Sequence, residues 1–339
     1  MPKLRKKDLL KEPIEHIDIT KLDVKNLVAA YGKMSFSARD LARGADIYNK
    51  MLADKNASVW LTLAGSTSAA GCMQVYVDLV KNNMVDVIVA TGASIVDMDF
   101  FEALGFKHYK GTPFIDDSLL RSLYIDRIYD TFIDEESLQN CDKTIKIIAD
   151  SLEKRPYSSR EFIKEMGRYL TKHSKKKNSL VQTAFEHNVP IFCPAFSDSS
   201  AGFGLIMHQT QNPKSHLSID SVKDFRELTE IKLKSKDSGL LMIGGGVPKN
   251  FAQDTVVAAE VLGHEVPVHK YAIQITVADV RDGACSSSTL KEASSWGKVS
   301  TVHEQMIFAE ASMALPILAA QAYQTGHWKK RPARSFAKI

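Results

Sequence analysis

The chain has 339 residues, of which 44% are hydrophobic and 25% are charged, so it can bury a sizeable core and is not disordered throughout. Its net charge is only +4, which over this length does not indicate a nucleic acid partner. At ~150 residues per domain the length permits two domains, but we expect a single domain over residues 1–339. Residues 1–16 would form an N-terminal extension and residues 325–339 a basic tail.

No segment of the sequence is apolar enough to cross a membrane. Stretches such as Val85–Ala90 and Ala314–Ala320 are much shorter than the ~18 apolar residues that a membrane helix needs. The basic N-terminal residues are followed by acidic ones and by no apolar run, which argues against a targeting segment. The four cysteines lie far apart and form no CxxC pair, so we expect reduced thiols and no metal site. We therefore expect a cytoplasmic protein without a membrane partner.

The order of apolar runs and helical patterns predicts an α/β fold. Short β-branched runs predict five strands, at Val59–Leu63, Val85–Ala90, Pro190–Cys193, Leu240–Ile243 and Tyr271–Val277. Apolar residues at three- and four-residue spacing predict helices at Ala69–Lys81, Ser158–Lys172, Ser179–Glu186, Asn250–Leu262 and Met306–Tyr323. Because strands and helices alternate, we expect a doubly wound, mainly parallel sheet with helices on both faces, in the manner of Rossmann-like folds.

Three further segments have no strong strand or helix pattern. Phe106–Pro156 lacks a convincing buried strand and is predicted to form helices and loops at the edge of the sheet. Lys172–Ser179 is predicted to be an exposed loop. We expect the basic cluster Lys175–Lys177 and the tail residues Lys329–Arg331 and Arg334 to be solvated, as charged runs usually are.

Small residues follow three of the predicted strands, at Leu63–Gly71, Ala90–Ser94 and Gly244–Gly246. Ligands of open α/β sheets bind outside the carboxyl ends of the strands, where small residues let a phosphate approach the backbone and helix N-termini. None of the three loops has the GxGxxG spacing, and any one of them is equally explained by helix–sheet packing. Together they favour a dinucleotide bound by a non-standard version of the fold.

A fourth loop, Val277–Lys298, ends on the cluster Glu292, Trp296, Gly297 and Lys298. A lysine attacks only as the neutral amine, which burial beside an apolar wall favours, and a tryptophan face attracts a cationic substrate. Spacing alone is also compatible with a surface lysine beside a packing tryptophan.

Several motifs of this chain resemble those of the deoxyhypusine synthase family. They are SSWGK, GGGVPK and EASMALPIL, together with PAFSDSSAGFG (Pro194–Gly204), YIDRIYDTF (Tyr124–Phe132) and the ATGAS loop. They occur in the family's order, so the resemblance covers roughly Ile17 to Tyr323. Within the family, PAFSDSSAGFG and GGGVPKNF are most similar to the bacterial deoxyhypusine synthase-like proteins.

The resemblance implies an NAD-binding homotetramer with active sites at a subunit interface. It implies that Lys298 carries the transferred aminobutyl-type group and that Trp296, Glu292 and Asp97 form the amine pocket. The implied NAD contacts are Gly65, Ser66, Thr91, Gly92, Ala93, Asp198, Gly244, Gly245, Ala278, Glu310 and Ala311.

Four pocket positions depart from the family pattern. Asn250 stands in place of a histidine that helps to hold and deprotonate the substrate amine, Phe203 and Cys285 replace two aspartates, and Asp254 replaces an asparagine. Losing a carboxylate that pairs with a desolvated ammonium group costs several kcal/mol. We therefore expect the donor to have changed, with a small amine rather than a protein lysine as acceptor.

The resulting hypothesis is an NAD-dependent transferase that moves an aminoalkyl-type group from a polyamine or guanidino donor, through an imine on Lys298, to an acceptor amine. True deoxyhypusine synthase and homospermidine synthase remain as alternatives with related chemistry. A catalytically silent NAD-binding homologue is the alternative from another class, and retention of Lys298 beside Trp296 argues against it.

Overall fold

The computed structural model describes residues 5–16, 18–21, 23–282 and 288–336. At its centre is a parallel sheet of six strands in the order β11-β10-β9-β1-β2-β7. The strands are β1 (Ala57–Leu63), β2 (Val87–Ala90), β7 (Ile191–Phe192), β9 (Asp237–Ile243), β10 (Tyr271–Thr276) and β11 (Glu304–Phe308). The α/β fold with a parallel sheet is confirmed.

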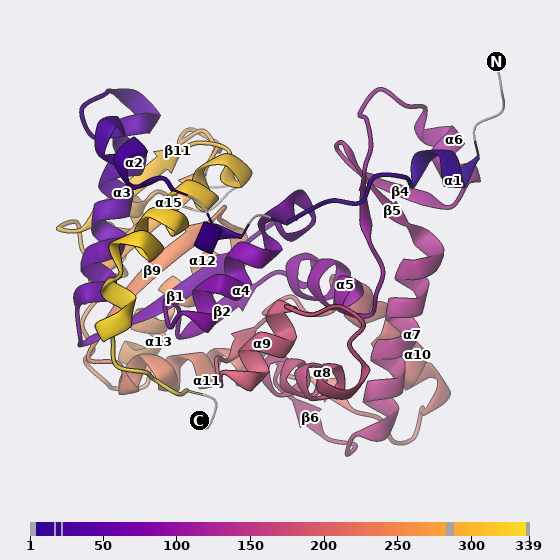
Figure 1. Ribbon diagram of the computed structural model, residues 1–339. Helices are drawn as coiled ribbons and strands as arrows, with labels where there is room; N and C mark the ends of the chain where they lie inside the picture. Colours follow the sequence, from indigo (N-terminus) through magenta and orange to yellow (C-terminus); the bar gives the residue numbers. More distant parts are fainter. Residues whose placement is uncertain (1–4, 17, 22, 283–287, 337–339) are drawn as a thin grey trace.

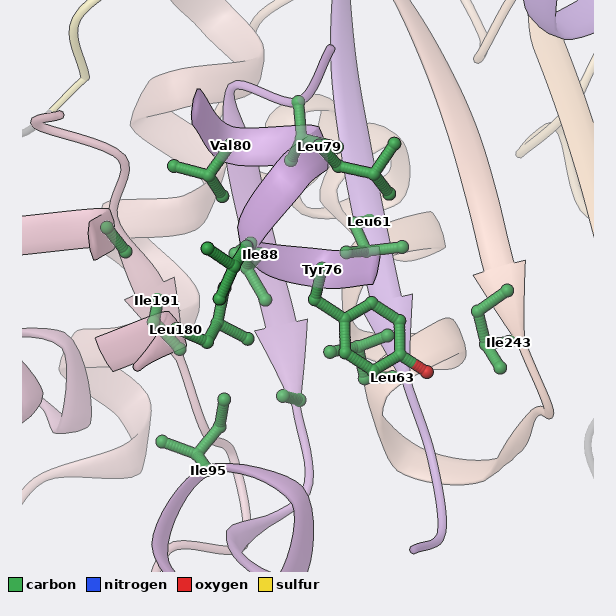
Figure 2. Close-up of a cluster of buried hydrophobic side chains, with 14 of the residues drawn as sticks. Leu61, Leu63, Tyr76, Leu79, Val80, Ile88, Ile95, Leu180, Ile191 and Ile243 are labelled. Carbon is green, nitrogen blue, oxygen red and sulfur yellow. The ribbon is translucent and has the colours of Figure 1, made fainter. Parts of the chain in front are cut away.

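Successive residues of each strand point to opposite faces of the sheet, and both faces are covered. Leu241 and Ile243 belong to one buried cluster, whereas Leu240 and Met242 belong to the other. The first face packs against α3 (Phe36–Ala53), α4 (Met73–Lys81), α9 (Leu180–Glu186) and α15 (Ala311–Thr325). Figure 2 shows this cluster, with Leu61 and Ile88 of the strands against Tyr76 and Leu180. The second face packs against α11 (Ser221–Lys234), α12 (Gly246–Gln253) and α14 (Leu290–Ser295).

The prediction of one helix over Met306–Tyr323 is wrong at its start. The segment begins as edge strand β11, and α15 follows only at Ala311. Most of β11 is half-buried, so it lacks the continuous apolar run of a central strand. Glu310 marks the start of α15, because its side chain accepts hydrogen bonds from the backbone N–H groups of Ser312 and Met313 and caps the helix.

The predicted helix Asn250–Leu262 is two helices, α12 and α13 (Thr255–Val261). The helix α12 starts earlier than expected, at Gly246, since Pro248 lies in its first turn, where a missing N–H breaks no intrahelical bond. Asp254 lies at the junction of the two helices.

The segment Phe106–Pro156 contains a second, antiparallel sheet, so the prediction of helices and loops alone is wrong. Its strands are β3 (His108–Lys110), β4 (Ile125–Ile128) and β5 (Thr131–Asp134), in the order β3-β5-β4. They are only three or four residues long, and β3 and β4 are partly exposed, which is why no buried-strand pattern marks them. Helix α6 (Asp117–Ser122) lies between β3 and β4, and α7 (Glu135–Ser151) follows β5. Helix α7 packs along α10 (Ser200–Gln211) on the side of the molecule away from α3 and α15 (Figure 1).

The two basic clusters are not simply solvated. Arg331 is buried and forms an ion pair with Asp86, while its guanidinium also donates to the Asn83 carbonyl at 2.9 Å. Lys176 forms an ion pair with the buried Glu102. The expectation of solvated chains is therefore wrong for these two residues, which anchor the tail and the loop to the core.

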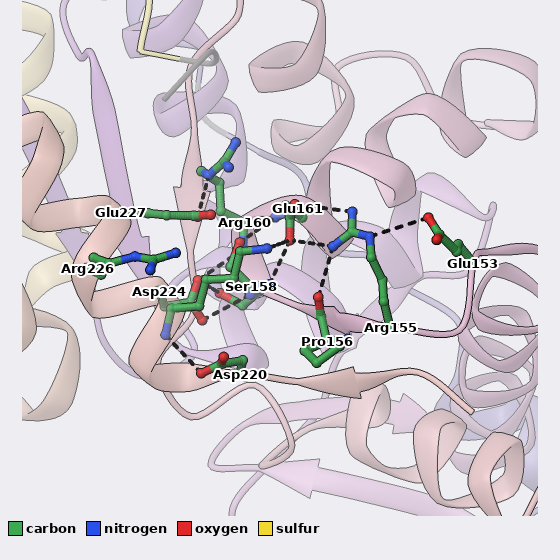
Figure 3. A network of polar contacts seen from close by, with 12 residues as sticks. Glu153, Arg155, Pro156, Ser158, Arg160, Glu161, Asp220, Asp224, Arg226 and Glu227 are labelled. Atoms are coloured by element: carbon green, nitrogen blue, oxygen red, sulfur yellow. Dashed lines mark hydrogen bonds and ion pairs between the residues drawn. The ribbon is translucent and has the colours of Figure 1, made fainter. Parts of the chain in front are cut away.

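A polar network fixes the start of α8 (Ser159–His173) to α11 (Figure 3). Asp224 accepts hydrogen bonds from the backbone N–H groups of Ser159 and Arg160, at 3.0 and 3.2 Å. Burial raises the pKa of Asp224 to about 7. The Ser159 hydroxyl also accepts from the Cys193 N–H at 2.7 Å, so this network sets where the chain leaves β7.

The remaining regular elements are α1 (Lys6–Leu9), α2 (Lys25–Tyr31), α5 (Phe101–Ala103), β6 (Pro156–Tyr157), β8 (Ser218–Ile219) and four short irregular or 3₁₀ segments. In the described parts of the chain, no helix has the length and apolar character needed to span a membrane.

Candidate functional site

A cavity of about 460 Å³ lies at the carboxyl ends of β1, β9 and β10 and at the start of α15. Five of the residues implied as NAD contacts line it: Gly65, Ser66, Gly244, Glu310 and Ala311. Two more border it, since Gly245 is the N-cap of α12 and Ala278 follows the lining residue Val277. The structure thus brings seven of the expected contacts together at one edge of the sheet.

Two glycines keep this cavity open. Gly65 has φ +71° and no atom within 4 Å of where a Cβ would lie, and Gly244 has φ +72° with such a Cβ 3.1 Å from that of Ala64. Side chains at these positions would be strained, and the one at Gly65 would occupy free space. The buried Ser68 hydroxyl, just beyond the loop, has no hydrogen-bond partner among the described residues. The two glycines leave backbone without side chains at the cavity, which fits the close approach of a dinucleotide.

The loop after β2 joins the loop after β1. The Ser94 hydroxyl donates to the Gly65 carbonyl at 2.7 Å, and that of Thr91 does so at 3.4 Å. Ala93 begins the next helical segment. Gly92 packs against Ser199, because a Cβ there would lie 2.5 Å from the Ser199 Cβ. The close packing of these two loops therefore explains the glycine at position 92 without a ligand.

Asp97, Asp198 and Phe203 lie beyond β2 and β7, around the start of α10. Asp97 accepts a hydrogen bond from the Ser200 N–H at 2.7 Å. Burial, together with the nearby charges of Asp142 and Asp198, raises the pKa of Asp97 to about 6. Asp198 is exposed, and Phe203 is 61% exposed on α10.

The lysine pocket, as we call Lys298, Asp254 and Trp296, lies on the other half of the molecule. The Lys298 amine is 2.5 Å from an Asp254 carboxylate oxygen and 5.3 Å from the Trp296 ring centroid. The Lys298 side chain is 13% exposed, whereas Trp296 is 68% exposed. The amine is therefore held by a carboxylate beside an aromatic wall that is open on its outer side.

His269 connects the two segments that carry the ion pair. Its backbone N–H donates to the Lys298 carbonyl at 2.9 Å, and its buried ring nitrogen Nε2 contacts the Ala252 carbonyl at 3.2 Å, two residues before Asp254. Burial lowers the pKa of the His269 ring, so it is neutral and Nε2–H is the donor.

Glu292 belongs to the N-terminal cap of α14, the helix that leads to Lys298. Its carboxylate accepts from the Thr289 N–H at 2.5 Å while the Thr289 hydroxyl accepts from the Glu292 N–H at 3.2 Å, which is a capping box for α14. The backbone hydrogen bond from Thr289 lowers the pKa of Glu292. Glu292 also lines a separate open groove of about 1030 Å³ with Glu304 and Phe308 of β11.

The single chain does not bring the expected amine pocket together. Strands β1 and β9 separate β2, which precedes Asp97, from β10. Asp97 and Phe203 therefore lie apart from Lys298, Asp254 and Trp296, and among the described residues no hydrogen bond or ion pair joins the two groups. Asn250 lies on α12, one turn before Asp254. Cys285 lies outside the described residues.

The comparison with known proteins decides which family these sites belong to. A model of the deoxyhypusine synthase family matches residues 26–322. The chain belongs to the deoxyhypusine synthase family. It is 67% identical over 340 residues to a deoxyhypusine synthase-like protein from Coxiella burnetii, which covers 100% of this chain and 96% of that protein.

Solved structures share the fold. A candidate deoxyhypusine synthase from Entamoeba histolytica has a TM-score of 0.62 and 20% identity, covering 96% of this chain and 100% of that one. AgrE in a ternary complex with ornithine and NAD+ has a TM-score of 0.55 and 10% identity, covering 86% of this chain and 34% of that one. Identities this low show a common fold alone.

Sequence reasoning missed three buried polar residues of this deoxyhypusine synthase-like site: Lys249, Gln274 and His269. Lys249 lies within GGGVPK, next to Asn250. The available signal was a lysine in the first turns of a helix directly after a glycine loop. Gln274 and His269 belong to or precede β10, where a polar residue in an apolar run marks a buried hydrogen bond.

Proposed function

We propose that this protein is an NAD-dependent transferase that moves an aminoalkyl-type group from a polyamine or guanidino donor, through an imine on Lys298, to an acceptor amine. The observation that carries the proposal is the placement of the Lys298 amine, 2.5 Å from Asp254 and beside Trp296, in the WGK motif of a deoxyhypusine synthase family member. The Asp254 carboxylate can take up the proton that the Lys298 amine must lose before it attacks, so the pair fits covalent catalysis better than passive cofactor binding.

The proposed NAD site is the cavity at the carboxyl edge of the sheet, with Gly65 and Gly244 beside the phosphates and Glu310 at its rim. When bound there, NAD would supply the acceptor and donor of a hydride. Support comes from the glycine cradle and from AgrE, whose solved complex contains NAD+. The Glu310 carboxylate is kept ionised, because hydrogen bonds from Ser312 outweigh partial burial and lower its pKa.

Lys298 and Asp254 would share the work on the transferred group. The Lys298 amine Nζ adds to the carbon of the oxidised donor, and the donor's original amine leaves, so that the carbon is held as an imine on Nζ. The acceptor amine then adds to the same carbon and Nζ leaves. Each addition releases a proton from nitrogen and each departure needs one, and Asp254, 2.5 Å from Nζ, would hold that proton between the steps.

A second copy of the chain would complete the pocket. Trp296 is 68% exposed, and the Asp97 and Phe203 group lies beyond reach of Lys298 on its own chain. An interface in a homotetramer would cover Trp296, exclude water and bring one copy's Asp97 to another's Lys298. Light scattering of the purified protein tests the assembly.

Asp254 also bears on the choice of donor. Its carboxylate is engaged by Lys298, which leaves fewer anionic groups for a substrate with two ammonium ends. A planar guanidinium is more weakly hydrated and stacks on aromatic faces, so Phe203 and Trp296, both exposed, would suit an agmatine-like donor.

The experiment compares NAD-dependent turnover of spermidine and agmatine, each with a small diamine and with a hypusine-type protein as acceptor. Faster turnover with agmatine and the diamine supports the proposal. Efficient modification of the protein acceptor with spermidine would instead establish a true deoxyhypusine synthase, and formation of homospermidine from spermidine and putrescine would establish the third variant. Binding of NAD without any amine turnover would identify a silent homologue.

A further inference from the structure

Lys249 is a fully buried lysine for which the proposed reaction has no role. Its amine donates to the Gln274 side-chain oxygen at 2.8 Å and to the Ser288 carbonyl. Within the described part of the chain, no carboxylate lies within ion-pair distance of this amine. Burial lowers the pKa of Lys249 to about 8, with Glu292 opposing the shift and Lys298 adding to it.

These contacts join three elements that belong to the two halves of the site. Lys249 is on α12, directly after the glycine loop, and Gln274 is on β10. Ser288 precedes Thr289, the N-cap of α14, and α14 leads to Trp296 and Lys298. The amine therefore ties the start of the lysine-bearing segment to the helix that begins at the cofactor cavity.

Gln274 extends the connection to the cavity itself. Its side-chain N–H donates to the Gly244 carbonyl at 3.0 Å, while its oxygen accepts from Lys249. Both the nitrogen and the oxygen of the Gln274 side-chain amide thus form hydrogen bonds, and Gln274 is only 2% exposed. The side chain of Gln274 therefore links the glycine loop directly to Lys249.

We propose that Lys249 and Gln274 form a clamp that couples the glycine loop of the cofactor cavity to α14 and so to the reactive lysine. Lys249 is a positioning residue in this clamp, not a second nucleophile, because its side chain is fully buried while that of Lys298 is 13% exposed. The inference rests on the proposed function, since it assumes that a dinucleotide occupies the cavity and that Lys298 reacts.

The test measures the reactivity of Lys298 without any turnover. Reductive methylation by formaldehyde and cyanoborohydride, followed by peptide mass spectrometry, gives the rate at which each lysine is labelled with and without NAD. We expect NAD to slow labelling of Lys298 in the wild-type protein about tenfold, an ordinary size for coupling between two sites. Calorimetry measures NAD affinity in parallel.

The variants separate the two links of the clamp. Lys249→Met removes both contacts of the amine with an apolar side chain of similar length, and Lys249→Arg keeps the charge and the donors. Gln274→Glu keeps an acceptor for Lys249 but cannot donate to the Gly244 carbonyl. The matched control is Lys232→Met: Lys232 is as buried, burial also lowers its pKa to about 8, and it donates to Ser238 at the opposite end of β9 from the glycine loop.

The clamp predicts that Lys249→Met and Gln274→Glu each bind NAD but lose the tenfold effect on Lys298, that Lys249→Arg regains most of it, and that Lys232→Met keeps it. Retention of the full effect in a folded Lys249→Met and in Gln274→Glu would overturn the clamp and leave the proposed function standing. A wild-type protein that fails to bind NAD would overturn the proposed function itself, and the clamp with it.

Discussion

The cofactor cavity and the lysine pocket are built in different ways. The cavity is lined by strand ends and by loops whose shape depends on two glycines with positive φ, so backbone geometry sets its form. The lysine pocket consists of side chains on short helices, and its aromatic wall is 68% exposed. Backbone geometry therefore shapes the cavity, whereas the positions of a few side chains shape the lysine pocket.

If the two regions work as separate parts, Lys298→Ala removes one and leaves the other. We expect turnover to fall to background and NAD affinity to stay at the wild-type value, because Lys298 does not line the cavity. Amine consumption and calorimetry measure the two effects. Lys291→Ala, an exposed lysine seven residues away, is the matched control and keeps full turnover. Multiple turnovers by Lys298→Ala would exclude covalent catalysis.

Asp254→Asn changes the lysine pocket less severely. The amide keeps a hydrogen-bonding oxygen near the Lys298 amine but cannot take up a proton, so we expect turnover to fall roughly 100-fold, as when a general acid–base group is lost. The adduct on Lys298 should still form slowly. Wild-type kinetics for this variant would show that Asp254 only balances charge.

Gly65→Ala tests the cavity alone. Gly65 and Gly263 both have positive φ and free space around a Cβ, so alanine costs each about 1–2 kcal/mol of stability. Only the methyl group at position 65 enters the cavity, and we expect it to weaken NAD binding about tenfold, which corresponds to about 1.4 kcal/mol. Calorimetry of both variants decides the point. Equal NAD affinity in the two would place the cofactor elsewhere.

Asp97→Asn is measured on the pH dependence of stability. The folded-state pKa of Asp97 is about 6 against an ordinary value of 3.8. Between these pH values the folded state binds more protons than the unfolded state. The free energy of unfolding therefore falls by at most about 3 kcal/mol as the pH rises from about 4 to 6, and then levels off. Asparagine removes this dependence. Urea unfolding at several pH values measures it, and an unchanged slope in the variant would mean that Asp97 is not the group responsible.

The order of elements was predictable because the central strands are apolar on both faces. Leu240–Ile243 lies within β9, and both Gly65 and Gly244 lie where strand ends were expected to bind a ligand. The edge strand β11 and the small antiparallel sheet were not predicted, since strands of three to five residues are too short to show a clear pattern and most of β11 and β3 is not fully buried.

The side-chain partners were harder to predict than the elements. Asp254 was noticed as a gained carboxylate, but its contact with Lys298 depends on how α12 ends and α14 begins. The burial of Arg331 and Lys249 depends on long-range packing that no local pattern encodes. A charged residue is expected to be exposed to solvent unless a buried partner for it is known, and the sequence does not show that partner.

Borohydride trapping tests the central claim most directly. The wild-type protein is incubated with NAD and a donor amine, reduced with borohydride and digested, and the peptide that carries Lys298 is weighed. The account predicts a mass increase on that peptide equal to the donor fragment, only when NAD is present. NAD-dependent turnover with no adduct on Lys298, or with the adduct on another residue, would contradict it.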